Sequence, residues 1–168
     1  MTWTTLSPLS LIALPAVGLG LWVTPAPSQQ ALQYMDDRST PEAVIQSYYN
    51  AINLGQLTRA YGYFSDGWAP KDYASWAEGY ADTKSVSVQI GSAPEDPGAG
   101  QVLWHIPVAV SALDKTGKTK VFAGCYEIHL TEPEMQTDPP FQPISINKAT
   151  LSPSDQPIQD ALPSTCPE

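Results

Sequence analysis

The stretch TPEAVIQSYYNAINLGQLTRAYGYFSDGWAPKDYASWAEGYADTKSVSV, residues 40–88, decides the fold class of this chain. It opens as a helix, because Thr40 suits the N-cap, Pro41 the first helical position, and Glu42 the first turn, where a carboxylate complements the helix dipole. Gly55 can take the left-handed conformation that ends such a helix. The residues at helical spacing that form its apolar face are Val44, Ile45, Tyr48, Tyr49 and Ile52.

Two shorter aromatic helices and a strand follow. An apolar stripe from Leu57 to Phe64 ends at the turn of residues 65–67. A third helix is expected from Lys71 to about Ala81. Gly79 inside this helix costs about 1 kcal/mol relative to Ala, so we expect a close backbone approach there. The side chains that this helix should bury on one side are Tyr73, Trp76, Ala77 and Tyr80. Residues 85–90 then alternate between polar and apolar, as in a half-buried strand.

The rest of the domain predicts an antiparallel hairpin and one more strand. Residues 102–113 and 119–130 should pair through a turn at 114–118, and a last strand is expected at about 144–151. Residues 91–100 predict a loop. A turn symmetric about Thr116 sets the register, since a slip of one residue would move every side chain to the other face. The predicted pairs are Trp104 with Ile128, Ile106 with Tyr126, Val110 with Phe122, and His105 with Glu127 on the outer face.

These elements predict the α+β class, with N-terminal helices packed on a curved antiparallel sheet of about four strands. The expected domain is cone-like and covers residues 40–151, after a linker at 29–39. Its floor should be formed by Trp104, Ile106, Val108, Phe122, Tyr126 and Ile128, with the aromatic helices as its lid.

The N-terminal segment indicates export. No charged side chain precedes Asp36, and an apolar run covers residues 6–23. Such a run is a signal peptide or a membrane anchor. Small residues at 26 and 28 suit cleavage before Gln29, although residues 1–5 contain no Lys or Arg. Residues 1–28 are therefore either a cleaved signal or an anchor through 6–23, and both place the folded part outside the cytoplasm, in the periplasm or secreted.

Charge and motifs exclude several classes of function. The formal net charge of -9 disfavours a nucleic-acid partner, because phosphate binding needs clustered Lys and Arg. We find no nucleophile elbow, phosphate-binding glycine loop or zinc-ligand spacing. We therefore expect no cofactor and no metal.

Two cysteines predict one disulfide. Cys125 lies in a predicted strand and Cys166 is close to the C-terminus, and an isolated pair in an oxidising compartment favours bonding. The closed loop of about 40 residues would stabilise the fold by roughly 3–4 kcal/mol in the chain-entropy model. The bond would tie down the proline-rich tail, residues 152–168.

Aromatic side chains are the main candidates for a site. Those expected at a ligand pocket are Tyr48, Tyr49, Trp76, Tyr80, Trp104 and Tyr126, although the same spacing also fits a packed core. Tyr49, Asp82 and Tyr126 are the candidates for acid–base chemistry. The His105–Glu127 pair should be a solvated cross-strand pair, and with His129 it is also the one set of side chains with the chemistry of metal ligands.

The order of three helices followed by a bent antiparallel sheet resembles the nuclear transport factor two-like superfamily, a cystatin-like α+β cone. Residues 48–53, 76–83 leading into 85–86, 121–126, and the Leu162-Pro163…Cys166 ending are similar to a group of uncharacterised exported bacterial proteins. This resemblance implies a pocket between helices and sheet. The superfamily includes isomerases, dehydratases and binding modules, so the fold alone carries no activity across.

Three hypotheses about function follow from the sequence. The first is a non-enzymatic extracytoplasmic module that binds a small apolar ligand or another exported protein. The second is an isomerase- or dehydratase-like enzyme acting on a small hydrophobic substrate. The third is an assembly factor tethered to the membrane by an uncleaved N-terminal segment.

Overall fold

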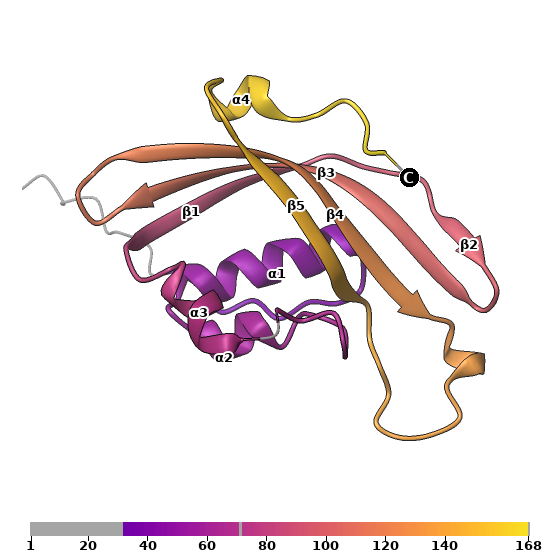
Figure 1. The fold of residues 1–168 in the computed structure, drawn as a ribbon. Helices are drawn as coiled ribbons and strands as arrows, with labels where there is room; N and C mark the ends of the chain where they lie inside the picture. The colour runs from indigo at the N-terminus through magenta and orange to yellow at the C-terminus, as the bar shows by residue number, and fades with distance from the viewer. Residues whose placement is uncertain (1–31, 71, 168) are drawn as a thin grey trace, which may run out of the picture. The chain divides into compact units, whose positions relative to one another are not determined.

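The computed structural model describes residues 32–70 and 72–167, and Figure 1 shows their fold. The chain is α+β, with helices first and an open antiparallel sheet after them, as predicted. The elements are α1 (Pro41–Asn53), α2 (Leu57–Tyr61), α3 (Tyr73–Glu78), β1 (Thr83–Ile90), β2 (Asp96–Gly98), β3 (Gln101–Asp114), β4 (Thr119–Thr131), the 3-10 turn η1 (Pro133–Met135), β5 (Ser145–Ser154) and α4 (Ile158–Ala161).

The sheet has the order β1-β3-β4-β5, with the short β2 paired to one end of β3. The register of the β3–β4 hairpin is the one predicted, since Trp104 lies opposite Ile128, Ile106 opposite Tyr126, and Val110 opposite Phe122. Asp114 closes the turn, because its side chain accepts hydrogen bonds from the backbone N–H groups of Thr116 and Lys118. A further hydrogen bond, from the Thr116 hydroxyl, is the main cause that lowers the pKa of this carboxyl group, and the backbone bonds add to it.

Helix α1 begins and ends as its sequence predicts. The Thr40 side chain accepts a hydrogen bond from the Ala43 N–H at 3.1 Å, and Gly55 has φ 68° just after the helix. The apolar face of α1 packs against the inner face of the sheet, where Ile106, Val108 and Ile128 are fully buried. Helices α1 to α3 thus lie on one side of the sheet (Figure 1).

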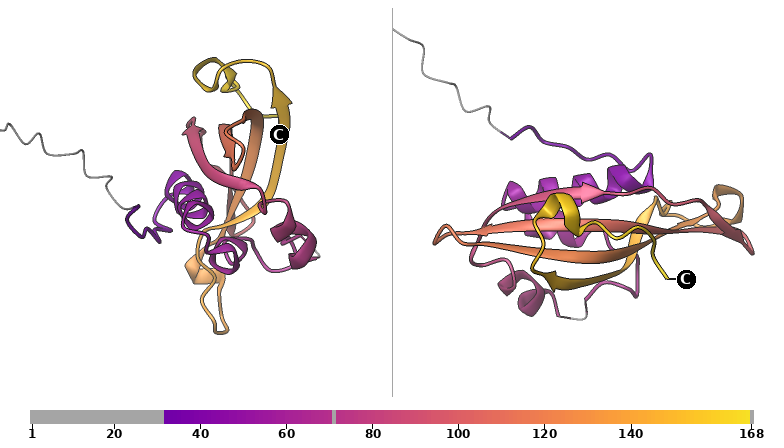
Figure 2. Two further views of the ribbon diagram at one scale, coloured as in Figure 1. Left: turned by 90° about the vertical axis from the view of Figure 1, so that its left-hand side faces the viewer. Right: turned by 90° about the horizontal axis from the view of Figure 1, so that it is seen from above.

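The C-terminal tail lies on the opposite face of the sheet. Helix α4 contacts β3 and β4 there, and Ala161 is buried against them. The predicted disulfide joins Cys125 of β4 to Cys166, with a Cα–Cα distance of 5.9 Å. Figure 2 shows the tail crossing the strands on the side away from α1. The tail is therefore ordered and covers part of the outer face.

Several element predictions need correction. Residues 96–98, expected in a loop, form β2, and β5 extends to Ser154, three residues past the predicted domain boundary. The tail also contains the short helix α4, because it has the outer face of the sheet to pack on.

The third helix is shorter than predicted and none of its residues is buried. Asp72 caps it, and Gly79 lies at its C-cap, so the predicted interior position of this glycine is wrong. The close backbone approach predicted at Gly79 is made by the helix itself, because a Cβ atom there would lie 3.1 Å from the Trp76 carbonyl oxygen. Tyr73 is 40% exposed and Trp76 is half-buried. The predicted burial is therefore wrong for Tyr73, whereas Trp76, Ala77 and Tyr80 are half-buried, because the helix packs at the margin of the core.

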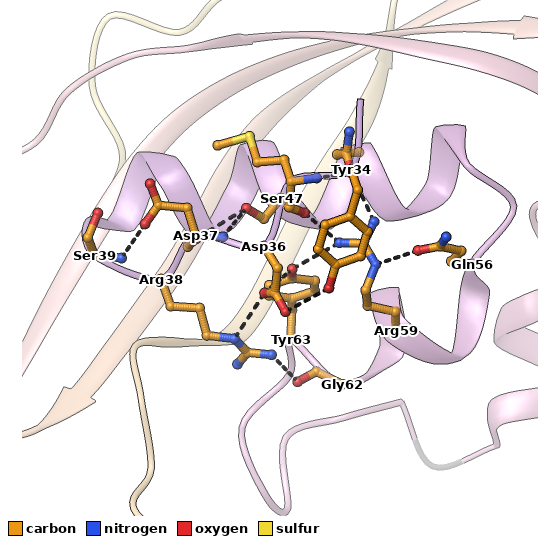
Figure 3. A network of polar contacts seen from close by, with 12 residues as sticks. Tyr34, Asp36, Asp37, Arg38, Ser39, Ser47, Gln56, Arg59, Gly62 and Tyr63 are labelled. Carbon is orange, nitrogen blue, oxygen red and sulfur yellow. Dashed lines mark hydrogen bonds and ion pairs between the residues drawn. The ribbon is translucent and has the colours of Figure 1, made fainter. Parts of the chain in front are cut away.

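Residues 33–39, which we expected to belong to a linker, lie against α1 and α2 in a polar network (Figure 3). Asn50 accepts a hydrogen bond from the Met35 N–H and donates one to the Gln33 carbonyl. Arg59 donates to the Met35 carbonyl at 2.6 Å and to Asn50 at 2.9 Å. We call residues 33–39 the N-terminal strap.

A second group of contacts fixes the other half of the N-terminal strap. Buried Ser47 accepts a hydrogen bond from the Asp37 N–H and donates one to the Asp37 carbonyl. The Tyr63 hydroxyl donates to Asp36 at 2.6 Å, and the Arg38 guanidinium lies 4.2 Å from the centroid of the Tyr63 ring. The N-terminal strap therefore lies along α1, although its own sequence has no regular spacing of apolar residues.

The predicted signal or anchor, residues 1–28, lies outside the described residues. Within residues 32–70 and 72–167, no helix is long and apolar enough to cross a membrane.

Gly124 of β4 is required for the approach of β5. A Cβ atom at this position would lie 1.9 Å from the Thr150 carbonyl oxygen, a contact that no side-chain adjustment can relieve. We predict that Gly124→Ala lowers the free energy of unfolding by about 1–3 kcal/mol through overpacking, measured by urea denaturation. Gly98→Ala, where the added methyl meets open space, is the matched control. Equal effects of the two changes would contradict the close approach.

The N-terminal strap should depend on Asn50. We predict that Asn50→Ala lowers the free energy of unfolding by about 0.5–1.5 kcal/mol, because the partly buried Met35 N–H and the Gln33 carbonyl lose their partner. Hydrogen exchange at the Met35 amide should also become faster. Gln46→Ala, at an exposed position on the same helix, is the control and should change neither measurement. Unchanged exchange at Met35 in Asn50→Ala would show that other contacts hold the strap.

Candidate functional site

Two pairs of tyrosine hydroxyls lie at the centre of the candidate site. The Tyr48 and Tyr80 hydroxyl oxygens are 2.7 Å apart, and those of Tyr49 and Tyr126 are 2.6 Å apart. Tyr48 and Tyr49 are neighbours on α1, so their side chains leave the helix about 100° apart. Tyr48 therefore reaches Tyr80, shortly after the end of α3, and Tyr49 reaches Tyr126 of β4.

Each pair retains one hydroxyl hydrogen. A hydrogen bond between two hydroxyls uses one hydrogen, and the hydroxyl that accepts it still has its own to donate. Apart from the two paired bonds, none of these four hydroxyls donates a hydrogen bond to another described residue. The remaining hydrogens are thus available to an oxygen acceptor that is not part of the described protein.

Burial keeps these phenols neutral. It is the main cause that raises the pKa of Tyr48, Tyr49, Tyr80 and Tyr126 above the usual value for tyrosine. The bond from Tyr126 offsets part of this effect at Tyr49, as the bond from Tyr48 does at Tyr80. At neutral pH the four hydroxyls are hydrogen-bond donors and not bases.

An open hollow of about 620 Å³ lies between α3 and the inner face of the sheet, and we call it the α3 cleft. Trp76 and Tyr80 line it on the helix side. Three charged side chains also line it: Asp82 and Lys120, which are exposed, and Asp114. The apolar side chains on the sheet side are Val86, Val110, Ala112, Leu113, Phe122 and Leu151.

A second hollow of about 410 Å³, the β5 groove, adjoins the α3 cleft. The two share Tyr49, Trp76, Tyr80 and Leu151. All four paired tyrosines line the β5 groove, together with Phe64, Trp68, Pro70, and Asn147 to Ala149 of β5. Trp68 is 56% exposed, so an indole ring is open to solvent beside this groove.

The structure brings most of the predicted site residues together. Tyr49, Trp76 and Tyr80 line both hollows, whereas Tyr48 and Tyr126 line the β5 groove. Asp82 lies at the α3 cleft but is exposed. Trp104 is different, because it is 7% exposed in the core and lines neither hollow.

The predicted outer-face residues do not form a catalytic couple. His105 lies opposite Glu127, but Glu127 accepts a hydrogen bond from Asn147, and His129 bonds to Gln101. Burial lowers the pKa of His129, and the charge of Glu127 partly offsets this shift. Within the described part of the chain, no group of three or more His, Cys, Asp or Glu side chains could hold a metal ion.

Sequence reasoning missed the contribution of residues 64–70 and of β5 to the site. Phe64 and Trp68 follow α2, and their only sequence signal was aromatic character next to a turn. Ser65 Oγ donates a hydrogen bond to Asn147 at 2.8 Å and lies 2.6 Å from Ser145 Oγ, so this segment is fastened to β5. These contacts join residues about 80 positions apart, which no local pattern reveals.

No family model, curated protein or solved structure matches this chain.

The buried tyrosines should make stability fall at high pH. A group whose pKa is raised in the folded state contributes stability that is present below its unfolded value, near 10, and is lost as the pH rises above it. We predict that the urea midpoint falls between pH 9 and about 11. The fall should be smaller in the double variant Tyr49→Phe/Tyr126→Phe, which removes two of these hydroxyls. An equal fall in both proteins would contradict the assigned pKa directions.

Proposed function

We propose that this protein is a non-enzymatic, extracytoplasmic binding module whose α3 cleft takes a small, mainly apolar ligand. The observation that carries this proposal is the meeting of an apolar cleft with buried, neutral tyrosine hydroxyls that retain hydrogens to donate. A ligand with an apolar body and an uncharged oxygen acceptor fits this chemistry.

The dimensions of the cleft support the proposal. Its volume of about 620 Å³ lies within the range of small-molecule sites. Four strands contribute apolar side chains, for example Val86 of β1 and Phe122 of β4, so the ligand would contact a preformed surface. Aromatic walls such as Trp76 and Tyr80 add large contact area with little loss of side-chain entropy.

The isomerase- or dehydratase-like alternative has one observation in its favour, the presence of Asp82 beside the tyrosines of the cleft. Asp82 is exposed, and the tyrosines are held as donors by their raised pKa. A general base needs a pKa near the working pH and must reach the proton that it removes. For this reason we rank binding above catalysis.

The compartment and the superfamily are also part of the proposal. The Cys125–Cys166 disulfide supports an oxidising compartment, in the periplasm or outside the cell. The order of helices and antiparallel strands supports the nuclear transport factor two-like superfamily. The tethered assembly factor stays an alternative, which N-terminal mass determination would test, since a chain that starts at Gln29 has lost the anchor.

The α3 cleft can be tested with the neutral fluorophore N-phenyl-1-naphthylamine. We predict saturable fluorescence enhancement with the folded protein and at least tenfold weaker binding in Ala112→Phe, because the added ring fills the cleft, a change of about 1.4 kcal/mol. Ser111→Phe is the matched control, since neighbouring residues on a strand point to opposite faces. Equal binding by both variants would place the probe elsewhere and contradict the proposal.

A further inference from the structure

Strand β5 is an edge strand that the protein covers only in part. One side of β5 pairs with β4. On the other side, Phe64 forms a parallel bridge with Ile146. The Ser65 N–H donates to the Ile146 carbonyl at 2.9 Å, and the Ile146 N–H donates to the Tyr63 carbonyl at 2.8 Å. The segment Tyr63–Ser65 thus acts as a short neighbouring strand.

The exposure of the residues in β5 changes at the point where the segment Tyr63–Ser65 no longer pairs with the strand. Ser145, Ile146 and Asn147 are buried, whereas Lys148, Ala149 and Thr150 are exposed. Among the described residues, no further strand pairs with the free side of β5 after the bridge at Ile146. Residues 148–152 therefore form a bare strand edge that directly continues a paired one.

The opposite edge of the sheet is treated differently. On β1, the Asn53 side chain accepts a hydrogen bond from the Val86 N–H at 2.6 Å and donates one to the Val86 carbonyl at 2.8 Å. Its amide therefore occupies the two backbone groups that a neighbouring strand would use. Such blocking is a common way in which proteins prevent pairing at an edge. No similar side chain bonds to the backbone of residues 148–152 among the residues that the structure describes.

The bare edge borders the β5 groove. Ala149 and Leu151 line this groove, across from the exposed ring of Trp68. Thr150, between them, lines a hollow on the outer face instead, as alternation along a strand requires. A strand laid beside β5 would accordingly place every second side chain in an aromatic groove. Lys148 lines both this groove and the hollow on the outer face, and it is the one charged side chain among the described residues that line the groove.

We infer that residues 148–152 of β5 accept an extended peptide from a partner protein, which adds a strand to the sheet and places alternate apolar side chains in the β5 groove. Backbone pairing would supply affinity and the groove would supply selectivity, as in other cases of strand addition. Pro153 has no N–H to offer, so the paired stretch is about five residues long. A peptide carboxylate near Lys148 would complement its charge.

Selection of random dodecapeptides displayed on phage against the full chain tests this inference. We expect the enriched peptides to carry apolar residues at alternate positions. Hydrogen exchange at the amides of residues 148–152 should slow down when a selected synthetic peptide is bound. N-methylation of alternate peptide bonds in that peptide should abolish binding, because it removes the donors while it retains the side chains.

Two substitutions on β5 test whether the peptide contacts the β5 groove or the outer face of the sheet. Ala149→Glu places a charge in the aromatic groove and should weaken peptide binding by at least about tenfold. Thr150→Glu places the same charge on the opposite face and should leave the affinity within about threefold. Thermal midpoints of both variants report on folding. Thr150 lines neither the α3 cleft nor the β5 groove, so binding of N-phenyl-1-naphthylamine should be unchanged in Thr150→Glu.

Three results would overturn the inference. In the first, no peptide is enriched. In the second, Ala149→Glu and Thr150→Glu weaken peptide binding equally. In the third, sedimentation shows a dimer of the protein that Ala149→Glu dissociates, so that a second copy and not a partner peptide takes the edge. If the protein binds the selected peptide but not the fluorophore, the result would contradict the proposed ligand site in the α3 cleft and would leave the inference about β5 standing.

Discussion

The antiparallel pairing of β3 with β4 is the constraint on which the rest of the structure depends. Its register places Trp104, Ile106, Val110, Tyr126 and Ile128 on one face, and a shift of one residue would turn all of them outward. The inner face then receives α1, and the outer face receives the tail through the Cys125–Cys166 bond. Both hollows of the candidate site exist because this sheet has one apolar side and is covered only in part by short helices.

Packing of the tyrosine pairs in the interior also determines the protonation state and hydrogen bonding of their hydroxyls. Tyr49 and Tyr126 pack as core residues, yet their hydroxyls require partners once water is excluded, and each becomes the partner of the other. Burial raises their pKa and removes them as bases, while one hydrogen per pair remains to be donated. In the proposed function, these hydroxyls therefore donate to a neutral acceptor and remove no proton from the ligand. The exposed position of Asp82 points in the same direction.

The two edge strands of the sheet, β1 and β5, differ in whether their unpaired backbone groups are occupied. Unpaired N–H and C=O groups on an edge strand invite another chain. Asn53 occupies such groups on β1, and residues 63–65 occupy those at Ile146 of β5. The remaining part of β5 is bare and borders aromatic side chains. Position within the sheet, and not residue type, makes Ala149 and Leu151 candidates for recognition.

Local sequence determined the caps of α1, the strand alternation and the β3–β4 register, because each depends on neighbours in the chain or on a single turn. The cysteine pair followed from the sequence for another reason, since the chain has only two cysteines. Tertiary structure alone decided that Trp104 lies in the core while Trp76 lines a cleft, and that the approach of β5 requires a glycine at position 124. It also decided that Asn50 and Arg59 hold the N-terminal strap. The physical reason is that burial and hydrogen-bond partners are properties of where distant segments meet, and an aromatic or polar residue has the same local pattern whether it meets a core, a cleft or solvent.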